Sequence, residues 1–346
     1  MALVCAVLAV AQGPSPNVSV YATGLNNPRG LTFGSDGLLY VAEGGAAGKT
    51  STVGTCEQVP DPIGPYTGGY TSRISKIDSH GSRMTVIDGL PSSQTNQGNL
   101  VSGVADIKFI GNTLYAVTGG SGCSHALEGT TNGIFKINSN NTWTMVADLS
   151  AFQKANPVAV PDPDDFEPDG TWYSMVAVRG ALYAVEANHG EIDKISLDGT
   201  ITRIADISAT QGHIVPAAVA YHGNFYVGNL NPFPIQEGSS KILKITPSGQ
   251  VETVVTGLTT VLGVAFDHDG YMYILENTTG NLFPTPGTGK VLRVVDGNLQ
   301  EIATGLFLPT GMTFGPDGAL YVSNVGFGPP PIGLGQIVRI TVPPVD

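Results

Sequence analysis

Six polar residues stand at one recurring place, three positions after a tyrosine, and are the first candidates for chemistry. They are Glu43, Thr118, Glu186, Asn229, Glu276 and Asn324. A ring of such oxygen ligands could bind Ca²⁺ or another divalent cation, or hold a sugar-like substrate. Short polar side chains also accept hydrogen bonds from the backbone of a following turn, and repetition in every unit favours that structural role. Ligand binding and turn stabilisation are therefore both open for this set.

Two carboxylates of the set, Glu186 and Glu276, are the candidate catalytic residues. Asn188 and His189 follow Glu186 closely. We treat Asn188 as a candidate ligand-binding residue and His189 as a candidate proton carrier, because imidazole titrates near neutral pH. The sequence has neither a Gly-x-Ser-x-Gly nucleophile motif nor a phosphate-binding glycine loop. Enzymatic activity is therefore left open by these residues.

A second candidate cation site is an acidic segment that is rich in hard oxygen ligands. Its carboxylates are Asp162, Asp164, Asp165, Glu167 and Asp169. The spacing from Asp165 onward imitates the first half of a calcium-binding EF-hand loop, but Val176 stands where the closing glutamate is needed. The pattern therefore favours a solvated acidic loop over a Ca²⁺ site.

Three later segments each combine prolines with one phenylalanine: Phe233, Phe283 and Phe327. Proline stiffens a loop and an exposed phenyl ring supplies apolar area, so these segments could rim a binding surface for an aromatic ligand or a protein. The same rings could instead pack on each other as a small loop core. The exposure of the three rings distinguishes the two hypotheses.

All these candidates are positioned by a repeated unit of four strands. The recurring tyrosines are Tyr40, Tyr115, Tyr183, Tyr226, Tyr273 and Tyr321. Each lies in a short apolar strand, and turn signals such as Asp36-Gly37 join that strand to a preceding one as a hairpin. Downstream, period-two segments such as Ile242-Leu243-Lys244-Ile245 predict a third strand, and a turn leads to a fourth. Six such units predict an all-β fold, a six-bladed β-propeller with four-stranded blades.

The two ends of the chain are predicted to complete one blade together. The sixth third-strand, near Ile340, has no fourth strand after it. A segment that matches the fourth strand, residues 19–25, instead precedes the first unit. Pairing of this N-terminal strand with the C-terminal blade would close the ring and remove open sheet edges. Residues 12–346 are thus expected to form a single propeller domain.

The long insertions all belong to connections that emerge on one face of such a propeller, which we call the loop face. They span residues 44–72, 91–101, 119–133, 150–172, 230–240, 277–289 and 325–335. Loops on a rigid scaffold carry binding sites disproportionately. The loop face is therefore where a small ligand or a protein partner is expected.

Composition and the N-terminus indicate the class of partner and the compartment. A net charge of −12 with only 16 Lys and Arg excludes a nucleic-acid partner, because phosphate binding needs clustered basic residues. Residues 1–11 are apolar and end in Ala9-Val10-Ala11, which predicts a signal peptide. A basic start is lacking, so the signal could be truncated, and a frayed apolar N-terminus is the alternative. No stretch is long enough to predict a transmembrane segment. A monomer that is secreted, periplasmic or extracellular is expected.

Cys56 and Cys123 remain after removal of the predicted signal peptide, both in loop-face insertions of adjacent blades. In an exported protein they are expected to form a disulfide that ties the two loops together. Free thiols are the alternative.

The repeat resembles the NHL type of propeller, most plainly from Pro28 to Glu43. The whole mature chain more closely resembles the ScyD/ScyE family, named from a cyanobacterial gene cluster for the pigment scytonemin. Three segments carry this likeness: Thr55-Cys56-Glu57-Gln58-Val59-Pro60, Gly64-Pro65-Tyr66-Thr67-Gly68-Gly69 and Gly122-Cys123-Ser124-His125. The resemblance implies an exported propeller whose biochemical role is largely unassigned.

A metal-dependent lactone or ester hydrolase is the enzyme alternative, because gluconolactonase-like propellers resemble this fold. Those proteins place acidic or amide ligands at the start of the innermost strands. The positions matched here are Arg29, Ala105, Ser174, Ala217, Leu262 and Thr310, and none is a carboxylate. The sequence therefore favours a binding propeller, with the hydrolase and a cell-envelope or matrix interaction protein as alternatives.

Overall fold

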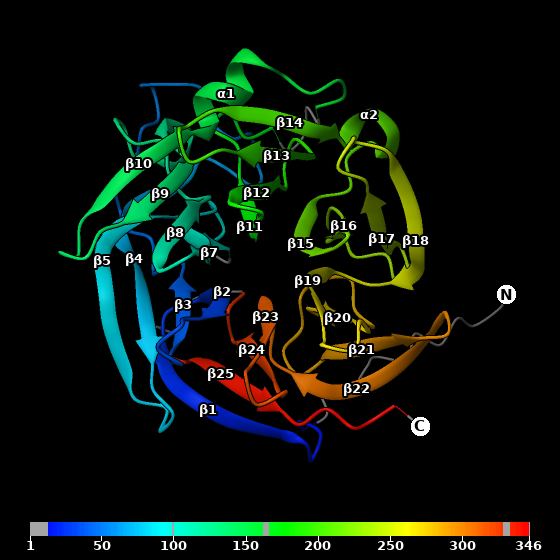
Figure 1. Ribbon diagram of the computed structural model, residues 1–346. Coiled ribbons are helices and arrows are strands. Elements are labelled where there is room, and N and C mark those ends of the chain that lie inside the picture. Colours follow the sequence, from blue (N-terminus) through cyan, green and yellow to red (C-terminus); the bar gives the residue numbers. More distant parts are fainter. Residues whose placement is uncertain (1–12, 99, 162–165, 328–332, 346) are drawn as a thin grey trace, which may run out of the picture.

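The computed structural model describes residues 13–98, 100–161, 166–327 and 333–345. In these residues six antiparallel sheets stand as blades in a ring around a central channel (Figure 1). The predicted six-bladed β-propeller is confirmed. The predicted signal peptide, residues 1–11, lies outside the described residues.

The first three blades follow one another along the chain. Blade 1 contains β2 (Pro28–Phe33), β3 (Leu39–Glu43), β4 (Thr67–Ile77), β5 (Arg83–Gln94) and the short additional strand β6 (Val101–Ser102). Blade 2 contains β7 (Val104–Ile110), β8 (Thr113–Thr118), β9 (Gly133–Ile137) and β10 (Trp143–Asp148). Blade 3 contains β11 (Trp172–Val178), β12 (Ala181–Glu186), β13 (Glu191–Ile195) and β14 (Ile201–Asp206).

The remaining blades keep the same order, and the last one uses both ends of the chain. Blade 4 contains β15 (Pro216–His222), β16 (Asn224–Asn229), β17 (Ser240–Ile245) and β18 (Val251–Leu258). Blade 5 contains β19 (Val261–Phe266), β20 (Met272–Glu276), β21 (Gly289–Val295) and β22 (Asn298–Leu306). Blade 6 contains β23 (Gly311–Phe314), β24 (Leu320–Asn324), β25 (Gly335–Ile340) and β1 (Val18–Leu25).

The ring is closed by the N-terminal strand, as predicted. In Figure 1 the blue β1 runs beside the red β25, and Val18 pairs with Ile340 in an antiparallel register. Since these residues are more than 300 positions apart, their pairing joins the chain ends into one sheet. The N-terminal strand thus covers the edge of β25, which would otherwise be exposed at the point where the ring closes.

The recurring tyrosines join neighbouring blades. Tyr40 lies edge-on to Phe109 of the next blade with ring centroids 5.0 Å apart, and Tyr273 contacts Phe314 in the same way. The Tyr40 hydroxyl also donates to Asp36 at 2.9 Å, the aspartate of the hairpin turn in its own blade. Tyr40 thus fixes both the turn of its own blade and the contact to the next blade, and Tyr321 does the same through Asp317 and Phe33.

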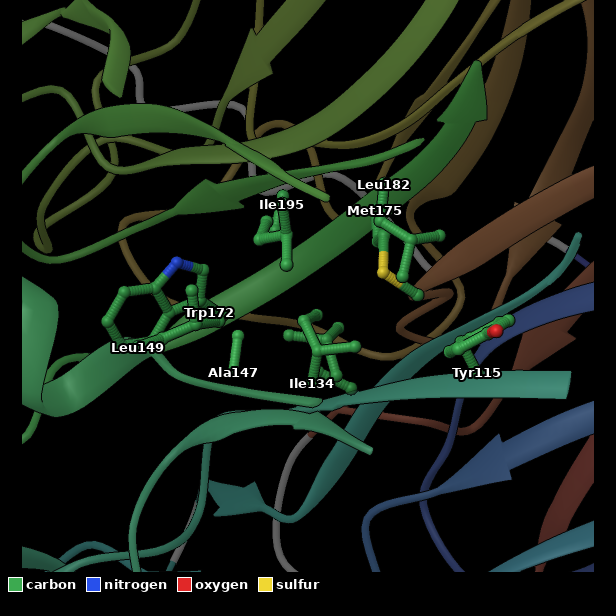
Figure 2. Packing of buried hydrophobic residues seen from close by; sticks show 11 residues of the cluster. Tyr115, Ile134, Ala147, Leu149, Trp172, Met175, Leu182 and Ile195 are labelled. Carbon is green, nitrogen blue, oxygen red and sulfur yellow. The ribbon is translucent and has the colours of Figure 1, made fainter. Parts of the chain in front are cut away.

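The core consists of apolar layers between adjacent blades. Figure 2 shows the layer between blades 2 and 3, where Ile134 and Leu182 lie close to Met175 and Trp172 fills the space beside Leu149. Trp172 is fully buried. Inward-facing residues that alternate along each strand supply these layers, as the period-two pattern predicted.

Helices are short and confined to connections. They are a 3₁₀ turn (Cys123–His125), α1 (Leu149–Ala155) and α2 (Ser208–Gln211). Asp148 caps α1 by accepting a hydrogen bond from the backbone N–H of Ala151 at 2.8 Å. No helix within the described ranges is long and apolar enough to cross a membrane.

Candidate functional site

The six recurring polar side chains lie at the loop-face ends of the second strands, and all are buried. Each accepts at least one hydrogen bond from a backbone N–H. The donors are Asn26 to Glu43, Gly133 to Thr118, Thr171 to Glu186, Lys241 to Asn229, Thr259 to Glu276 and Phe307 to Asn324. The set therefore has the turn-stabilising role left open by the sequence, while ligand binding by it stays a prediction.

Glu186, one of the candidate catalytic carboxylates, is surrounded by donors. Backbone N–H groups of Thr171 and Asn188 donate to its Oε1, and those of His189 and Gly190 donate to its Oε2. Burial raises its pKa to about 7, although these donors oppose the shift by stabilising the charged form. Both oxygens are thus occupied by the backbone of its own blade.

The other two catalytic candidates are also buried. Burial raises the pKa of Glu276, and Lys290, whose Nζ lies 3.4 Å from Oε2, opposes the shift. Burial lowers the pKa of His189. The Nε2 of His189 lies 3.0 Å from the Glu167 carbonyl oxygen, so it must carry the proton, because a carbonyl can only accept. His189 and Glu276 lie in different blades, and the structure does not bring them together.

The central channel contains one carboxylate among the described residues that line it, Asp106. Asp106 accepts from the backbone N–H groups of Ile107 and Met175 and from Lys108 Nζ, at 2.7, 2.8 and 2.6 Å. A β-carbon at Gly30 would overlap the Asp106 carboxylate, so glycine is required there. Asp106 therefore bonds the first strands of blades 2 and 3 to each other and packs closely against the first strand of blade 1.

The strand pairing corrects one position of the expected innermost set. Met175 pairs with Ala184 as Ile107 pairs with Ala116, which places Ser174 level with Asp106. Tyr173, one residue earlier, therefore occupies the position that the sequence assigned to Ser174. A register shift of one residue reverses the face on which a side chain lies.

Arg29, Tyr173 and Phe327 close the loop-face end of the channel. Arg29 Nη1 donates to the Tyr173 hydroxyl at 2.8 Å, and the guanidinium lies 5.4 Å from the Tyr173 ring centroid and 5.9 Å from that of Phe327. A cavity of about 280 Å³ lies in the channel beyond them. A divalent cation does not fit this end of the channel, because a guanidinium and aromatic rings stand where oxygen ligands would be needed.

The three phenylalanines of the proline-rich loops divide into two groups. Phe327 is buried, and the half-buried Phe233 packs against the same apolar cluster with its ring centroid 6.4 Å from that of Phe327. Phe283 is 62% exposed and its neighbour Leu282 is 64% exposed. Two rings thus form the loop core, and the third remains available to a partner.

The candidate Ca²⁺ segment is described only in part. Asp162, Asp164 and Asp165 lie outside the described residues. Glu167 accepts from the Tyr66 hydroxyl at 2.7 Å, and Asp169 accepts from Lys154 and from Ser124. Within the described residues no group of three or more His, Cys, Asp or Glu side chains is arranged to hold a metal ion.

Three loops of the loop face are tied to each other. Cys56 and Cys123 form the predicted disulfide, which joins insertions of blades 1 and 2. The Thr50 hydroxyl donates to the Ala126 carbonyl at 2.9 Å and strengthens the same junction. The bonds from Tyr66 to Glu167 and from Ser124 to Asp169 attach the connection that precedes β11. The loops are therefore pre-organised, which lowers the entropy lost on binding.

His125 lies at the centre of this junction and is fully buried. Its Nδ1 lies 3.1 Å from the Ser93 hydroxyl, and its ring is edge-on to Tyr66. Burial lowers its pKa, but hydrogen bonding to Glu167 and the nearby acidic charges outweigh burial and raise it above the usual value. His125 therefore connects the loops of blades 1 and 2 with the connection that precedes β11.

A groove of about 260 Å³ opens beside these tied loops, and we call it the loop-face groove. Its walls are mostly apolar, and Phe166 lies against the His189 ring with centroids 4.9 Å apart. The lining residues are Glu57, Gln153, Lys154, Pro157, Val158, Pro161, Phe166, Pro168 and His189. Of the residues selected from sequence, only His189 lies in this groove. For the lining residues between 157 and 168, the clustered prolines of that segment were the only signal in the sequence.

Comparisons with known proteins identify the fold and no family. No family model and no curated protein matches the chain. Among solved structures, a protein of unknown function from Bacteroides thetaiotaomicron matches with a TM-score of 0.61 at 13% identity, over 95% of this chain and 76% of that one. A putative oxidoreductase (glucose dehydrogenase) from Thermus thermophilus matches with 0.60 at 16%, over 94% and 99%. A gluconolactonase from Xanthomonas campestris matches with 0.56 at 11%, over 94% and 89%.

Proposed function

We propose that this protein is an exported binding propeller that takes up a small ligand with an apolar or aromatic part in the loop-face groove. The observation that supports it is the groove itself, an apolar cavity between loops that are tied by a disulfide and by buried hydrogen bonds. Ligand sites are typically pre-formed clefts with apolar walls and a few polar groups. In the groove the polar residues are Glu57, Gln153, Lys154 and His189.

The chemistry of the groove favours a neutral ligand over an anion. The protein carries a net charge of −12, and Lys154 Nζ is already bonded to Asp169 at 2.6 Å. The Nε2 proton of His189 is used by the Glu167 carbonyl, so this ring offers its Nδ1 side and its face. An aromatic ligand would stack beside Phe166 and leave polar substituents toward the rim.

We expect the neutral dye Nile red to bind the groove and indole to displace it. Phe166→Ala should weaken dye binding by about tenfold, because an aromatic wall contributes about 1.5 kcal/mol or more of apolar burial. Fluorescence titration measures both affinities. Phe283→Ala is the matched control, since it removes a phenyl ring from the same face outside the groove.

Equal affinities for the wild-type protein and Phe166→Ala would contradict the groove as the site. A loss confined to Phe283→Ala would instead support the second candidate, a protein or envelope partner, which the exposure of Leu282 and Phe283 favours. The hydrolase alternative is tested in parallel with lactone and ester substrates, with and without EDTA. Turnover that requires a divalent ion would support it over a binding role.

Export and membership of the ScyD/ScyE family belong to the same proposal. The Cys56–Cys123 disulfide supports export, because disulfides persist in oxidising compartments. The six-bladed fold agrees with what the family resemblance implies. Mass spectrometry of the protein recovered outside the cells that make it tests this part, and cleavage before Gln12 is the expected result.

A further inference from the structure

A different site emerges from the way neighbouring blades contact each other at the outer rim. Each of the six fourth strands has a bulged residue, and in three of these strands the carbonyl oxygen of that residue faces a turn of the next blade. The bulged residues are Tyr21, Val86, Val146, Ile204, Val254 and Ile302. What covers each carbonyl decides whether the gap between two blades is filled.

In three gaps the covering group is a glycine from the turn between the third and fourth strands. Gly81 packs on the Tyr21 carbonyl, Gly199 on that of Val146 and Gly249 on that of Ile204. A β-carbon at any of them would overlap the carbonyl oxygen. Each glycine has a positive φ and donates its N–H to the residue three positions earlier, for example Gly199 to Ser196. These gaps are closed by backbone-to-backbone contact.

Blade 2 has asparagine at this position. The Asn141 N–H donates to the Asn138 carbonyl as Gly199 donates to Ser196, and Asn141 keeps a positive φ of 60°. Its side chain, however, prevents the close approach that the three glycines allow. A cavity of about 540 Å³ lies in this gap, between Val86 on β5 and Asn141 beside β10. The asparagine side chain thus accounts for the open gap between blades 1 and 2, and we call the cavity the rim groove.

An indole ring forms one wall of the rim groove. Trp143 is 45% exposed, and it is the first residue of β10. The buried Phe135 supports it edge-on, with ring centroids 4.7 Å apart at 74°. An exposed tryptophan that is held by a second aromatic ring provides a rigid flat surface for stacking.

Hydrogen-bonding groups line the rest of the rim groove. Asp88 and Thr85 come from β5, and Asn141 and Thr142 come from the turn before β10. Asp88 and Asn141 are exposed, so a ligand can reach their polar atoms. Thr142 is held in place by a bond of its hydroxyl to Asn140 at 2.6 Å. In Figure 1, β5 and β10 lie side by side at the edge of the ring, away from the channel.

We propose that the rim groove between blades 1 and 2 is a saccharide-binding site, in which a sugar ring stacks on Trp143 and its hydroxyls bond to Asp88 and Asn141. A pyranose has an apolar C–H face and a hydroxylated edge, and the groove offers one indole face and polar groups of both donor and acceptor type. A nucleotide is disfavoured, because Asp88 and the net charge of −12 repel phosphate. The rim groove is separate from the loop-face groove, so neither proposal depends on the other.

Tryptophan fluorescence provides a direct test, because the sequence contains only two tryptophans and Trp172 is fully buried. The probes are glucose, galactose and N-acetylglucosamine, each with its β-linked di- and trisaccharide. At least one of them is expected to change the Trp143 emission in a saturable way, more strongly as the chain lengthens. Asp88→Asn should weaken that binding by about tenfold.

The decisive variant is Asn141→Gly, which restores the residue found in the three filled gaps. It should let the turn close onto the Val86 carbonyl and weaken saccharide binding by about tenfold or more, without lowering the unfolding midpoint. Leu197→Ala, an exposed residue in the corresponding turn of blade 3, is the control and should bind as the wild type does. Calorimetry with Trp143→Ala, which should abolish binding, removes dependence on the fluorescent reporter.

Two results would overturn the proposal. One is the absence of a saturable change with every probe. The other is a change that persists at full affinity in both Asn141→Gly and Asp88→Asn, since binding would then take place elsewhere.

Discussion

Replacing Glu43 with alanine is expected to destabilise the protein by about 3–5 kcal/mol, the range found when one partner of a buried ion pair is removed. Glu43 is fully buried, and Arg73 Nε and Nη2 both donate to its carboxylate at 2.7 Å. Its Oε2 also accepts the backbone N–H of Asn26 at 2.6 Å. The substitution would remove the carboxylate that accepts from the Arg73 guanidinium, the Ser75 hydroxyl and the Asn26 backbone N–H. Urea denaturation of the wild type and the variant measures the difference.

Thr118→Ala is the matched control for this prediction. Thr118 occupies the same place in blade 2 but accepts one backbone bond, at 3.2 Å from the Gly133 nitrogen. Its loss should cost about 1 kcal/mol, the net value of one neutral hydrogen bond. If the Glu43 variant were as stable as the Thr118 variant, the structural role of the six recurring polar side chains would be contradicted. Ligand binding by these side chains would then become the better explanation of their recurrence.

The fold could be predicted because the repeat is redundant. Tyr40 and its counterparts mark each second strand, and the segment at residues 19–25 matches a fourth strand that is missing after Ile340. Such signals are local in sequence, so they can be read without knowing what lies nearby in space. The disulfide followed from the fold, since Cys56 and Cys123 both lie in insertions on the same face.

The register of blade 3 shows where local patterns stop being sufficient. Val178 pairs with Ala181 across the tight turn at Arg179-Gly180, so β11 continues one residue beyond the shared pattern. A comparison of apolar residues alone therefore aligned Ser174 with Ala105 of blade 2, whereas the strand pairing aligns it with Asp106. Only the pairing with β12 reveals that Tyr173 is the residue beside Arg29.

The site was less predictable, because it depends on which loops converge. Nothing in the sequence around Phe166 and Val158 indicates that the two residues line the same groove. Asn141 looks like an ordinary turn residue until the three glycines of the other turns are seen against neighbouring carbonyls. These features are set by contacts between blades, and the sequence of one blade does not contain them.

Blade 3 contains a group of buried acids that makes the stability of the protein depend on pH. Glu186, Glu191 and Asp193 are fully buried, and Arg203 donates to Glu191. Among the described residues Asp193 has no close hydrogen-bond partner, and an interaction with the Trp172 side chain opposes the effect of burial on its pKa only in part. Burial raises the pKa of all three, to about 7 for Glu186 and Glu191 and well above the usual value for Asp193, and repulsion from Glu191 adds to the shift at Asp193.

The sign of the effect follows from proton linkage. A carboxyl group whose pKa is higher in the folded state binds its proton more tightly there, so its contribution is full below about pH 4.5 and is lost as pH rises through about 7. For Glu186 alone the shift corresponds to about 3 kcal/mol. Aspartates with lowered pKa values, such as Asp169 and Asp206, act at lower pH, where stability falls again. We therefore expect maximum stability on the acid side of neutrality.

Urea denaturation at a series of pH values checks this expectation, and Asp193→Asn identifies the cause. Asparagine resembles the protonated acid and does not titrate, so the variant should lose less stability than the wild type between pH 5 and pH 8. Asp198→Asn changes an exposed aspartate of the same blade and should keep the wild-type slope. A flat wild-type profile, or equal slopes in Asp193→Asn and the wild type, would contradict the prediction. The buried acids would then be ionised in the folded protein, with Arg203 and the four backbone donors around Glu186 outweighing the effect of burial.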